Sequence, residues 1–305
     1  MVSERALVER ILRLTRMPND DSALVRTSSK LLAASSDIAF SSTHSPKGIS
    51  HYYMGWRSAA SNLSDLAATG AQPLAFLLSL GLPSNNSKKL SQQIVKGALD
   101  ACKQHGTAYA GGDVKRAKEL VLAGFALGEL KGKGMKRSNA RAGDVVCIAG
   151  SIGDAACGFH ALSKNKKTPV RLLNAFLKPR ALLKQGAMVA KATKRAACMD
   201  VSDGLLFTCS EIARLSKVRI DLESLSIPIS PEAHTYAASN SLPFNRLVNW
   251  GEDYSLVFSM GVRDFEKLYK KAGLVCIGFA SKGRGLYLDG KKLNAKGYDA
   301  FKNSI

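Results

Sequence analysis

The chain has 305 residues, of which 46% are hydrophobic and 22% are charged, a composition typical of a soluble globular protein. No apolar run approaches the roughly 20 residues that a membrane-spanning helix needs. The first 14 residues, MVSERALVERILRL, mix acids with bases and place apolar residues at helical spacing, so they predict a helix and not a signal peptide. The six cysteines show no CxxC spacing, which is typical of buried thiols in a reducing compartment. These features predict a cytoplasmic protein.

The net charge of +20 arises from 44 Lys and Arg residues against 24 Asp and Glu residues. Such an excess is compatible with nucleic-acid binding or with a surface that favours anionic small substrates. The bases are scattered, with short clusters such as Lys166-Lys167 and Lys270-Lys271, and no arginine-rich helix or aromatic RNA-binding motif is present. The sequence therefore favours small anionic substrates over nucleic acid.

The first half of the chain alternates apolar strands with amphipathic helices. After the first helix, the patterns predict a strand, a helix, a strand, a helix and two strands, over 31–40, 53–69, 74–82, 88–105, 108–114 and 120–130. A polar loop that holds His44 is expected between the first strand and its helix. This order predicts an α+β sandwich with one mostly antiparallel sheet.

The second half begins after a basic, glycine-containing segment, 131–143, which is predicted to be a linker. We therefore predict two domains, 1–137 and 138–305.

A strand at 145–149 runs into Gly150-Ser151-Ile152-Gly153-Asp154 and a helix. This turn lacks the GK[ST] ending of a P-loop and the third glycine of a dinucleotide-binding loop, so close helix–strand packing is favoured over a phosphate site.

An acidic turn at Asp200-Val201-Ser202-Asp203-Gly204 lies between an apolar strand and a helical pattern. Unpaired charge at a buried strand end costs several kcal/mol, and a divalent cation is one way to offset that cost. Capping of the helix by Ser202 or Asp203 is the alternative explanation.

Acidic residues recur at the ends of other apolar elements, each beside Ser, Gly or Asn: Asp20, Asp21, Asp37, Asp65 and Asp113. Carboxylates gathered from strand ends repel one another unless cations lie between them. Mg²⁺ with a nucleotide polyphosphate would satisfy such a group, since Mg²⁺ uses few carboxylates together with phosphate oxygens and water. The residues alone do not establish that these turns converge in space.

Seven motifs in order carry a resemblance that spans nearly the whole chain: NDDSA, SSD, NLSDLAATGA, GGD, RSNARAGD, MDVSDGL and GEDYSLVF. With them, the sequence resembles the thiamine-monophosphate kinases, in the ATP-binding superfamily that includes aminoimidazole ribonucleotide synthetase. MDVSDGL and GEDY indicate the kinases more than their relatives.

The resemblance implies a two-domain α+β chain with a C-terminal α/β domain. Its N-terminal α/β sandwich would form a barrel shared with a second subunit, so that the protein is a homodimer with ATP in the adjoining cleft. It implies Mg²⁺ ligands at Asp21, Ser35, Ser36, Asp37, Asp65, Asp113, Asp200 and Asp203. It implies nucleotide contacts at Gly112, Asp113, Arg137 and Ser202, and thiamine monophosphate contacts at His44, Glu252 and Tyr298. Catalysis would rest chiefly on Asp37, Asp65 and Asp113.

The sequence departs from the family pattern at three places, which involve four residues. Asn19 stands where a glycine usually precedes the aspartate pair, Ser41 and Ser42 replace a pair that usually ends in glycine, and Val114 replaces a common threonine. The serine pair lies just before His44 and so affects the expected substrate loop.

The expected activity is ATP-dependent phosphorylation of thiamine monophosphate by direct in-line transfer, because no Ser-His or Cys-His pairing that would support a covalent intermediate is evident. The alternatives are another ATP-using synthetase of the same superfamily, a basic nucleic-acid-binding protein, and a homologue that binds nucleotide without catalysis.

Overall fold

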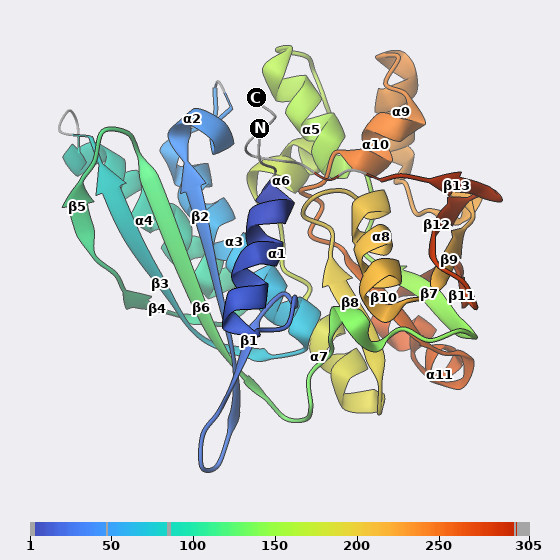
Figure 1. The fold of residues 1–305 in the computed structure, drawn as a ribbon. Helices are drawn as coiled ribbons and strands as arrows, with labels where there is room; N and C mark the ends of the chain where they lie inside the picture. The colour runs from blue at the N-terminus through green and yellow to red at the C-terminus, as the bar shows by residue number, and fades with distance from the viewer. Residues whose placement is uncertain (1–3, 47, 84–86, 296, 298–305) are drawn as a thin grey trace.

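Two β-sheets, one from each half of the chain, lie on either side of a central helix, α3 (His51–Thr69) (Figure 1). The computed structural model describes residues 4–46, 48–83, 87–295 and 297. In these residues, no helix is long and apolar enough to cross a bilayer. The expected mixed α/β architecture is confirmed.

The first sheet has the strand order β1-β2-β6-β3-β4, with β5 also paired to β3. Its pairs are antiparallel except those of β4 and β5 with β3, so the expected mostly antiparallel sheet is confirmed. The strands are β1 (Ala23–Arg26), β2 (Leu31–Phe40), β3 (Gln72–Leu82), β4 (Ala108–Gly111), β5 (Val114–Arg116) and β6 (Val121–Leu130).

Two local expectations for this half are wrong. The strand expected over 108–114 is two short strands, β4 and β5, interrupted at Gly112 and Asp113. Gly112 lies directly against β3, where a Cβ would be 1.9 Å from the carbonyl oxygen of Leu78, so only glycine fits this close approach at the interruption. The loop expected around His44 begins with a single helical turn, α2 (Ser41–His44).

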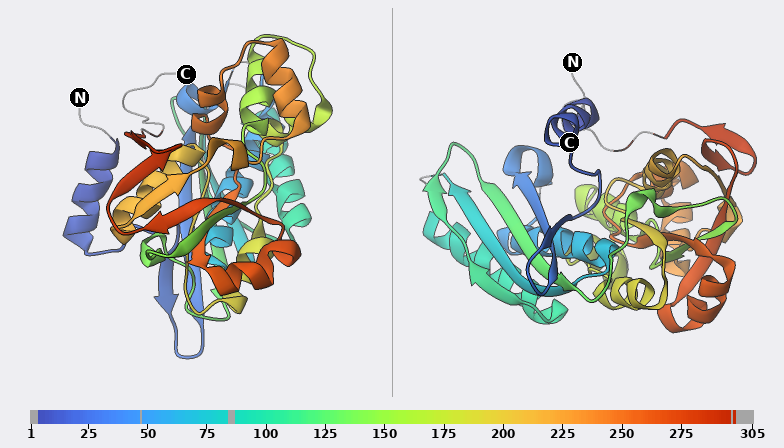
Figure 2. Two further views of the ribbon diagram at one scale, coloured as in Figure 1. Left: turned by 90° about the vertical axis from the view of Figure 1, so that its right-hand side faces the viewer. Right: turned by 60° about the horizontal axis from the view of Figure 1, so that its bottom comes forward.

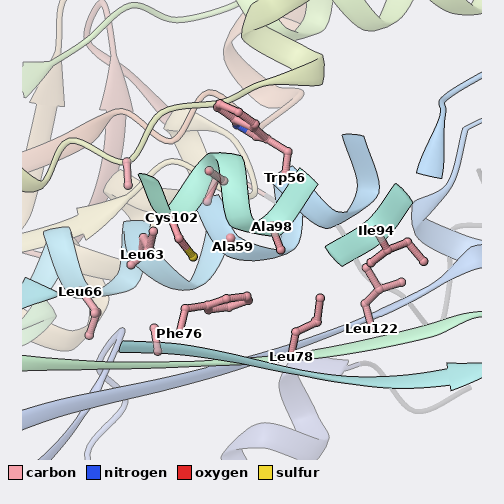
Figure 3. Close-up of a cluster of buried hydrophobic side chains, with 14 of the residues drawn as sticks. Trp56, Ala59, Leu63, Leu66, Phe76, Leu78, Ile94, Ala98, Cys102 and Leu122 are labelled. Carbon is pink, nitrogen blue, oxygen red and sulfur yellow. The ribbon is translucent and has the colours of Figure 1, made fainter. Parts of the chain in front are cut away.

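Helices α3 and α4 (Ser87–His105) cover one face of this sheet. Leu63 and Leu66 of α3, Ile94 of α4 and Phe76 of β3 are fully buried between them, and Figure 3 shows these side chains meeting between helices and sheet. Trp56 points away from the sheet (Figure 3), and its indole nitrogen donates to the carbonyl oxygen of Pro179 at 3.0 Å. The helix α3 is thus anchored on both sides.

The second sheet has the strand order β13-β12-β9-β11-β7-β10-β8. Its strands are β7 (Asp144–Ala149), β8 (Ala196–Asp200), β9 (Arg219–Leu222), β10 (Leu256–Gly261), β11 (Leu274–Ser281), β12 (Gly285–Leu288) and β13 (Lys291–Leu293). The helices around it are α5 (Asp154–Ser163), α6 (Val170–Leu177), α7 (Leu183–Ala192), α8 (Leu205–Ser216), α9 (Pro231–Ser239), α10 (Phe244–Asn249) and α11 (Val262–Ala272). Two short 3₁₀ helices, η1 (Arg137–Asn139) and η2 (Ser224–Ser226), lie in the connections.

The two halves meet closely at α3 and α7. A Cβ on Gly186 of α7 would lie 2.0 Å from the carbonyl oxygen of Ala67, so a glycine is needed where these helices cross. Ala67 and Ala68 of α3 also belong to the core that contains β7, β8 and β10. The helix α3 therefore packs against both halves of the chain and fixes their relative position.

The first helix, α1 (Glu4–Thr15), belongs to the first half in sequence but lies beside α8 of the second half (Figures 1 and 2). Arg5 pairs with Glu211 at 2.9 Å, and Glu9 pairs with Arg214 at 3.8 Å. The predicted boundary at 137/138 falls within η1, yet contacts such as these cross it. The division into 1–137 and 138–305 therefore stays a prediction about chain segments.

Candidate active site

A cavity of about 960 Å³ lies between the end of β2, one face of α3, the turn after β8 and the segment before β10. The residues of α3 that line it are Met54, Arg57, Ser58, Ser61 and Asp65. Their spacing places them on one stripe of the helix. The cavity therefore runs lengthwise along α3.

Three carboxylates converge at one end of this cavity. Asp21 comes from the segment before β1, Asp65 from α3 and Asp200 from the end of β8, and one oxygen of each lies within 4.8 Å of the others. The hydroxyl of Ser35 donates to Asp65, and that of Ser64 donates to Asp200 at 2.6 Å. We call these three residues the acid cluster.

Ionisation of the acid cluster is unfavourable in free energy when no cation is bound. Burial raises the pKa of Asp65 well above its ordinary value, and the charges of Asp37, Asp200 and Asp21 add to that rise. Burial, followed by the charge of Asp21, raises the pKa of Asp200 to about 7. A divalent cation with oxygen ligands would relieve both the burial cost and the repulsion, so the donor set fits Mg²⁺.

Asp203 lies in the turn after β8 and lines the same cavity. Burial and then the charge of Glu4 raise its pKa to about 7. Its neighbour Ser202 also lines the cavity, and the Ser202 carbonyl oxygen accepts a hydrogen bond from the backbone N–H of Glu252 at 2.8 Å. The acidic turn and the GEDY segment are thus joined through their backbones.

Asp37 lies near the acid cluster without being one of its three members. The Asp37 side chain is exposed to the cavity. Desolvation by the surrounding protein nevertheless raises its pKa, and a hydrogen bond from Ser61 and the nearby His44 oppose that rise. Ser36, the preceding residue, points to the opposite face of the sheet, and its hydroxyl donates to the Gly124 carbonyl oxygen at 3.0 Å. Of the two serines proposed as ligands, Ser35 alone lies beside the cluster.

Arg137 binds Asp21 in a fork, with Nε 3.1 Å from Oδ2 and Nη2 2.8 Å from Oδ1. Burial by itself would lower the pKa of this guanidinium, but Asp21 and then Asp200 and Asp65 raise it above its ordinary value. Nη1 also donates to Oδ1 of Asn19 at 3.2 Å, which gives the unusual Asn19 a structural role. In this conformation, Arg137 acts as a counter-charge behind the acid cluster and is not presented to the cavity.

Gly112 and Asp113 do not join the acid cluster within one chain. Gly112 lies against Leu78 of β3, which pairs with Gly124 of β6, which in turn pairs with Asp37. Three strand spacings of about 4.8 Å place Asp113 roughly 14 Å from Asp37. Its side chain is 62% exposed and pairs with Lys115 at 3.3 Å. A single ion cannot be shared by Asp113 and Asp65 of the same chain in this conformation.

Glu252 lines the cavity from a turn of unusual backbone shape. Gly251, Glu252 and Tyr254 all have positive φ, at 88°, 59° and 49°. A Cβ on Gly251 would lie 2.2 Å from the Ser202 carbonyl oxygen, so this turn can approach the acidic turn only with glycine there. Left-handed residues of this kind are costly and concentrate at functional sites. The turn presents the Glu252 carboxylate to the cavity.

Arg57 of α3 pairs with Glu252 and also donates from Nη1 to the Phe176 carbonyl oxygen at 2.8 Å. Its guanidinium lies 4.4 Å from the centre of the Phe176 ring. His44 lines the cavity as expected, and its Nδ1 lies 2.7 Å from the Thr43 hydroxyl. The expected substrate residue Tyr298 lies outside the described residues.

An aromatic wall, formed by Phe159, Phe176 and Trp250, lines the cavity near Glu252. Phe159 and Trp250 are stacked with ring centres 4.3 Å apart, and Phe159 meets Phe176 edge-on at 5.3 Å. Neither this wall nor Arg57 was predicted from the sequence. Helical spacing from Asp65 could have placed Arg57 on the functional stripe of α3, but no local pattern joins Phe159 to Trp250.

Asp253, next to Glu252, faces away from the cavity and accepts hydrogen bonds from the backbone N–H groups of Gly153 and Ala155, at 3.0 and 3.2 Å. It therefore caps the N-terminus of α5. Burial nevertheless raises its pKa to about 8, against the lowering effect of these two hydrogen bonds. The glycine turn before α5 is occupied by this carboxylate, in agreement with its interpretation as a packing turn.

Comparison with known proteins identifies the family of this chain. Residues 19–130 match the model of the AIR synthase related protein, N-terminal domain. The thiamine-monophosphate kinase of Methanospirillum hungatei is 31% identical over 281 residues, which cover 92% of each chain. The chain belongs to the thiamine-monophosphate kinase family. Its relative from Buchnera aphidicola subsp. Acyrthosiphon pisum is 33% identical over 303 residues, covering 92% of this chain and 91% of the relative.

Solved structures agree with this assignment to the thiamine-monophosphate kinase family. The structure of AaThiL complexed with AMPPCP and TMP has a TM-score of 0.89 and 28% sequence identity, and the match covers 97% of this chain and 96% of that one. The match therefore includes both sheets and the cavity between them.

Proposed function

We propose that this protein transfers the γ-phosphoryl group of ATP to thiamine monophosphate, giving thiamine diphosphate and ADP. The observation that carries the proposal is that one cavity brings together the acid cluster and, around Arg57, Glu252 with the aromatic wall. Arg57 and Asp65 are eight residues apart on α3, which corresponds to roughly 12 Å along the helix. That span separates a site for phosphates from a site for a cationic heterocycle. Support also comes from AaThiL, whose structure holds an ATP analogue and TMP.

In this proposal, Asp21, Asp65 and Asp200 hold Mg²⁺, with Asp37 and Asp203 facing the same space and Ser35 fixing Asp65. The bound metal would neutralise charge on the phosphate groups during transfer. Arg137 keeps Asp21 in place by its two hydrogen bonds, and Ser64 does so for Asp200. The acceptor phosphate is already anionic near neutral pH, so the residues need to position it rather than deprotonate it.

Glu252 and the aromatic wall are proposed to bind the thiazolium and pyrimidine rings. A carboxylate and aromatic faces together suit a cationic aromatic ligand. Arg57 holds Glu252 from one side, and His44 lies on the same cavity. Tyr298 is retained as a proposed contact on the family resemblance alone.

The direct test is incubation with ATP, Mg²⁺ and thiamine monophosphate, with products identified by mass. Thiamine diphosphate and ADP in equal amounts are expected. A synthetase of the same fold would instead release stoichiometric inorganic phosphate without a diphosphate product. A nucleic-acid-binding protein would show no turnover and an affinity for nucleic acid that falls steeply with salt.

Glu252→Gln should raise KM for thiamine monophosphate more than KM for ATP, because it removes the charge that faces the cationic ring while it preserves the side chain's size. Steady-state kinetics with each substrate varied in turn measure this difference. Glu223→Gln is a suitable control, because Glu223 lies after β9 and does not line the cavity. An equal rise in both KM values would argue for a structural role of Glu252.

We further propose a homodimer in which the open face of the first sheet becomes part of a shared barrel. The helices α3 and α4 cover one face only, and Ile38 and Phe125 on the strands β2 and β6 are 55% and 38% exposed. Gly112 and Asp113 would then serve the nucleotide through the assembled dimer, because they lie far from the acid cluster of their own chain.

Phe125→Glu is expected to convert a dimer into a monomer, because it places a charge in the proposed apolar interface. Sedimentation velocity at micromolar concentration measures the change. Leu99→Glu is the matched control, since Leu99 lies on α4 and is 43% exposed. A wild-type protein that sediments as a monomer would contradict the proposed dimer.

A further inference from the structure

A buried side-chain amide links α3 to the strand that carries Asp37. Asn62 is fully buried, its Oδ1 accepts a hydrogen bond from the backbone N–H of Asp37 at 3.2 Å, and its Nδ2 donates to the Ser58 carbonyl oxygen at 2.9 Å. Each end of the amide thus has a partner. A helix side chain thereby supplies the acceptor for a backbone donor in the middle of β2.

Gly124 makes this contact possible. It stands opposite Asp37 in the register of β2 and β6. A Cβ at this position would lie 2.5 Å from Nδ2 of Asn62 and 3.1 Å from the Ser58 hydroxyl oxygen. Any larger residue would therefore displace the Asn62 amide from its position against the Asp37 backbone.

The same helix reaches β2 at two further points. The Ser35 hydroxyl donates to Asp65, and Ser61 hydrogen-bonds to the Asp37 carboxylate. Asn62 differs from these contacts because it acts on the backbone and has no carboxylate or hydroxyl to offer a ligand. It fixes where the Cα of Asp37 lies relative to Asp65, three residues further along α3.

We propose that Asn62, seated in the slot left by Gly124, is a positioning residue for phosphoryl transfer. It sets the distance between Asp37 and the acid cluster, so that Asp37 faces the same metal and phosphate groups as Asp65. This inference rests on the proposed function. The geometry requires an amide, because aspartate lacks the donor for Ser58 and leucine lacks both hydrogen-bonding groups.

The test uses Asn62→Leu, which keeps the branched shape, and Gly124→Ala, which keeps Asn62 but displaces its amide. The full-length protein is titrated with Mn²⁺ alone, without nucleotide, and binding is followed by electron paramagnetic resonance. We expect each variant to bind Mn²⁺ about tenfold more weakly and to lose roughly 30- to 100-fold in kcat, since misplacement by about 1 Å can cost a hundredfold. KM for thiamine monophosphate should change little.

Ser259→Ala is the matched control, because the buried Ser259 hydroxyl donates to Asp144 in the second sheet at 3.0 Å, away from the cavity. Both kinds of variant lose a buried hydrogen bond, but only the Asn62 and Gly124 variants should lose Mn²⁺ affinity. Folded Asn62→Leu or Gly124→Ala protein with wild-type Mn²⁺ affinity would overturn the inference. If Asn62→Leu fails to fold, the Mn²⁺ affinity of Gly124→Ala tests the inference on its own. Wild-type protein that binds Mn²⁺ but forms no thiamine diphosphate would refute the proposed function and leave the positioning test intact.

Discussion

Asp65→Asn is expected to lower kcat by at least about a hundredfold, while the metal-free protein becomes more resistant to heat. The loss in rate follows if the ionised Asp65 contributes about 3 kcal/mol of charge stabilisation through a bound metal, since each 1.36 kcal/mol corresponds to a factor of ten. Asn has nearly the same shape, so the Ser35 hydroxyl keeps an acceptor. Asp37→Asn should act in the same direction.

The gain in stability has a separate cause. The metal-free acid cluster holds three carboxylates within 4.8 Å, and burial raises the pKa of Asp65 well above its ordinary value. Removing one of the charges relieves both burial cost and repulsion. Thermal unfolding in the presence of a chelator measures this effect, and steady-state kinetics with Mg²⁺ measure the rate.

Asp100→Asn provides the control for this pair of measurements. Asp100 lies on α4 beside Lys96 and outside the cavity, so the substitution should leave kcat unchanged. Near-normal turnover by both Asp65→Asn and Asp37→Asn would exclude a catalytic role for these carboxylates. A phosphorylated enzyme trapped with labelled ATP in the absence of thiamine monophosphate would contradict direct transfer.

The sequence predicts the elements that frame the site because their periodicity is strong and local. The strand predicted over 31–40 has the observed bounds of β2, and the helix predicted over 53–69 begins two residues earlier, as α3. The three members of the acid cluster were all among the candidate metal ligands. Their convergence depends on the packing of α3 between two sheets, which no local pattern encodes.

Neighbouring residues within one motif also have roles that the sequence does not separate. Glu252 and Asp253 are adjacent carboxylates, yet one faces the cavity and the other caps α5. Their directions are set by the positive φ of Glu252 and Tyr254, a backbone shape with no sequence signature apart from the preceding glycine. The structural role of Arg137 likewise cannot be predicted from local sequence, because its partner Asp21 lies 116 residues away in the chain.

Metal binding should release protons and strengthen steeply with pH up to about pH 7. Asp200 and Asp203 each have a pKa raised to about 7, in both cases chiefly by burial, so near pH 6 each is mostly protonated in the metal-free protein. Mg²⁺ requires the ionised form and must displace these protons. Each proton released gives about a tenfold change in apparent affinity per pH unit below the pKa.

In the metal-free protein, these groups make the free energy of unfolding fall as pH rises, whereas metal affinity increases with pH. The folded pKa values lie above the ordinary value of 3.8, so the folded protein binds more protons than the unfolded chain between about pH 4 and pH 7. The contribution of these groups to the free energy of unfolding therefore falls as pH rises through that window. Added Mg²⁺ should offset the fall most strongly near pH 7 and above, where it finds both carboxylates ionised.

Calorimetric titration with Mg²⁺ in two buffers of different ionisation enthalpy counts the protons released, and we expect more at pH 6 than at pH 8, because Asp200 and Asp203 are mostly ionised at pH 8. Asp203→Asn should reduce the number at pH 6 by about one, because it removes one titrating group while the acid cluster of Asp21, Asp65 and Asp200 remains. Proton release that is absent at pH 6, or unchanged between pH 6 and pH 8, would show that the metal does not bind at these carboxylates. The Asp203 variant then distinguishes direct competition between proton and metal from titration elsewhere, since only direct competition makes the count depend on that single side chain.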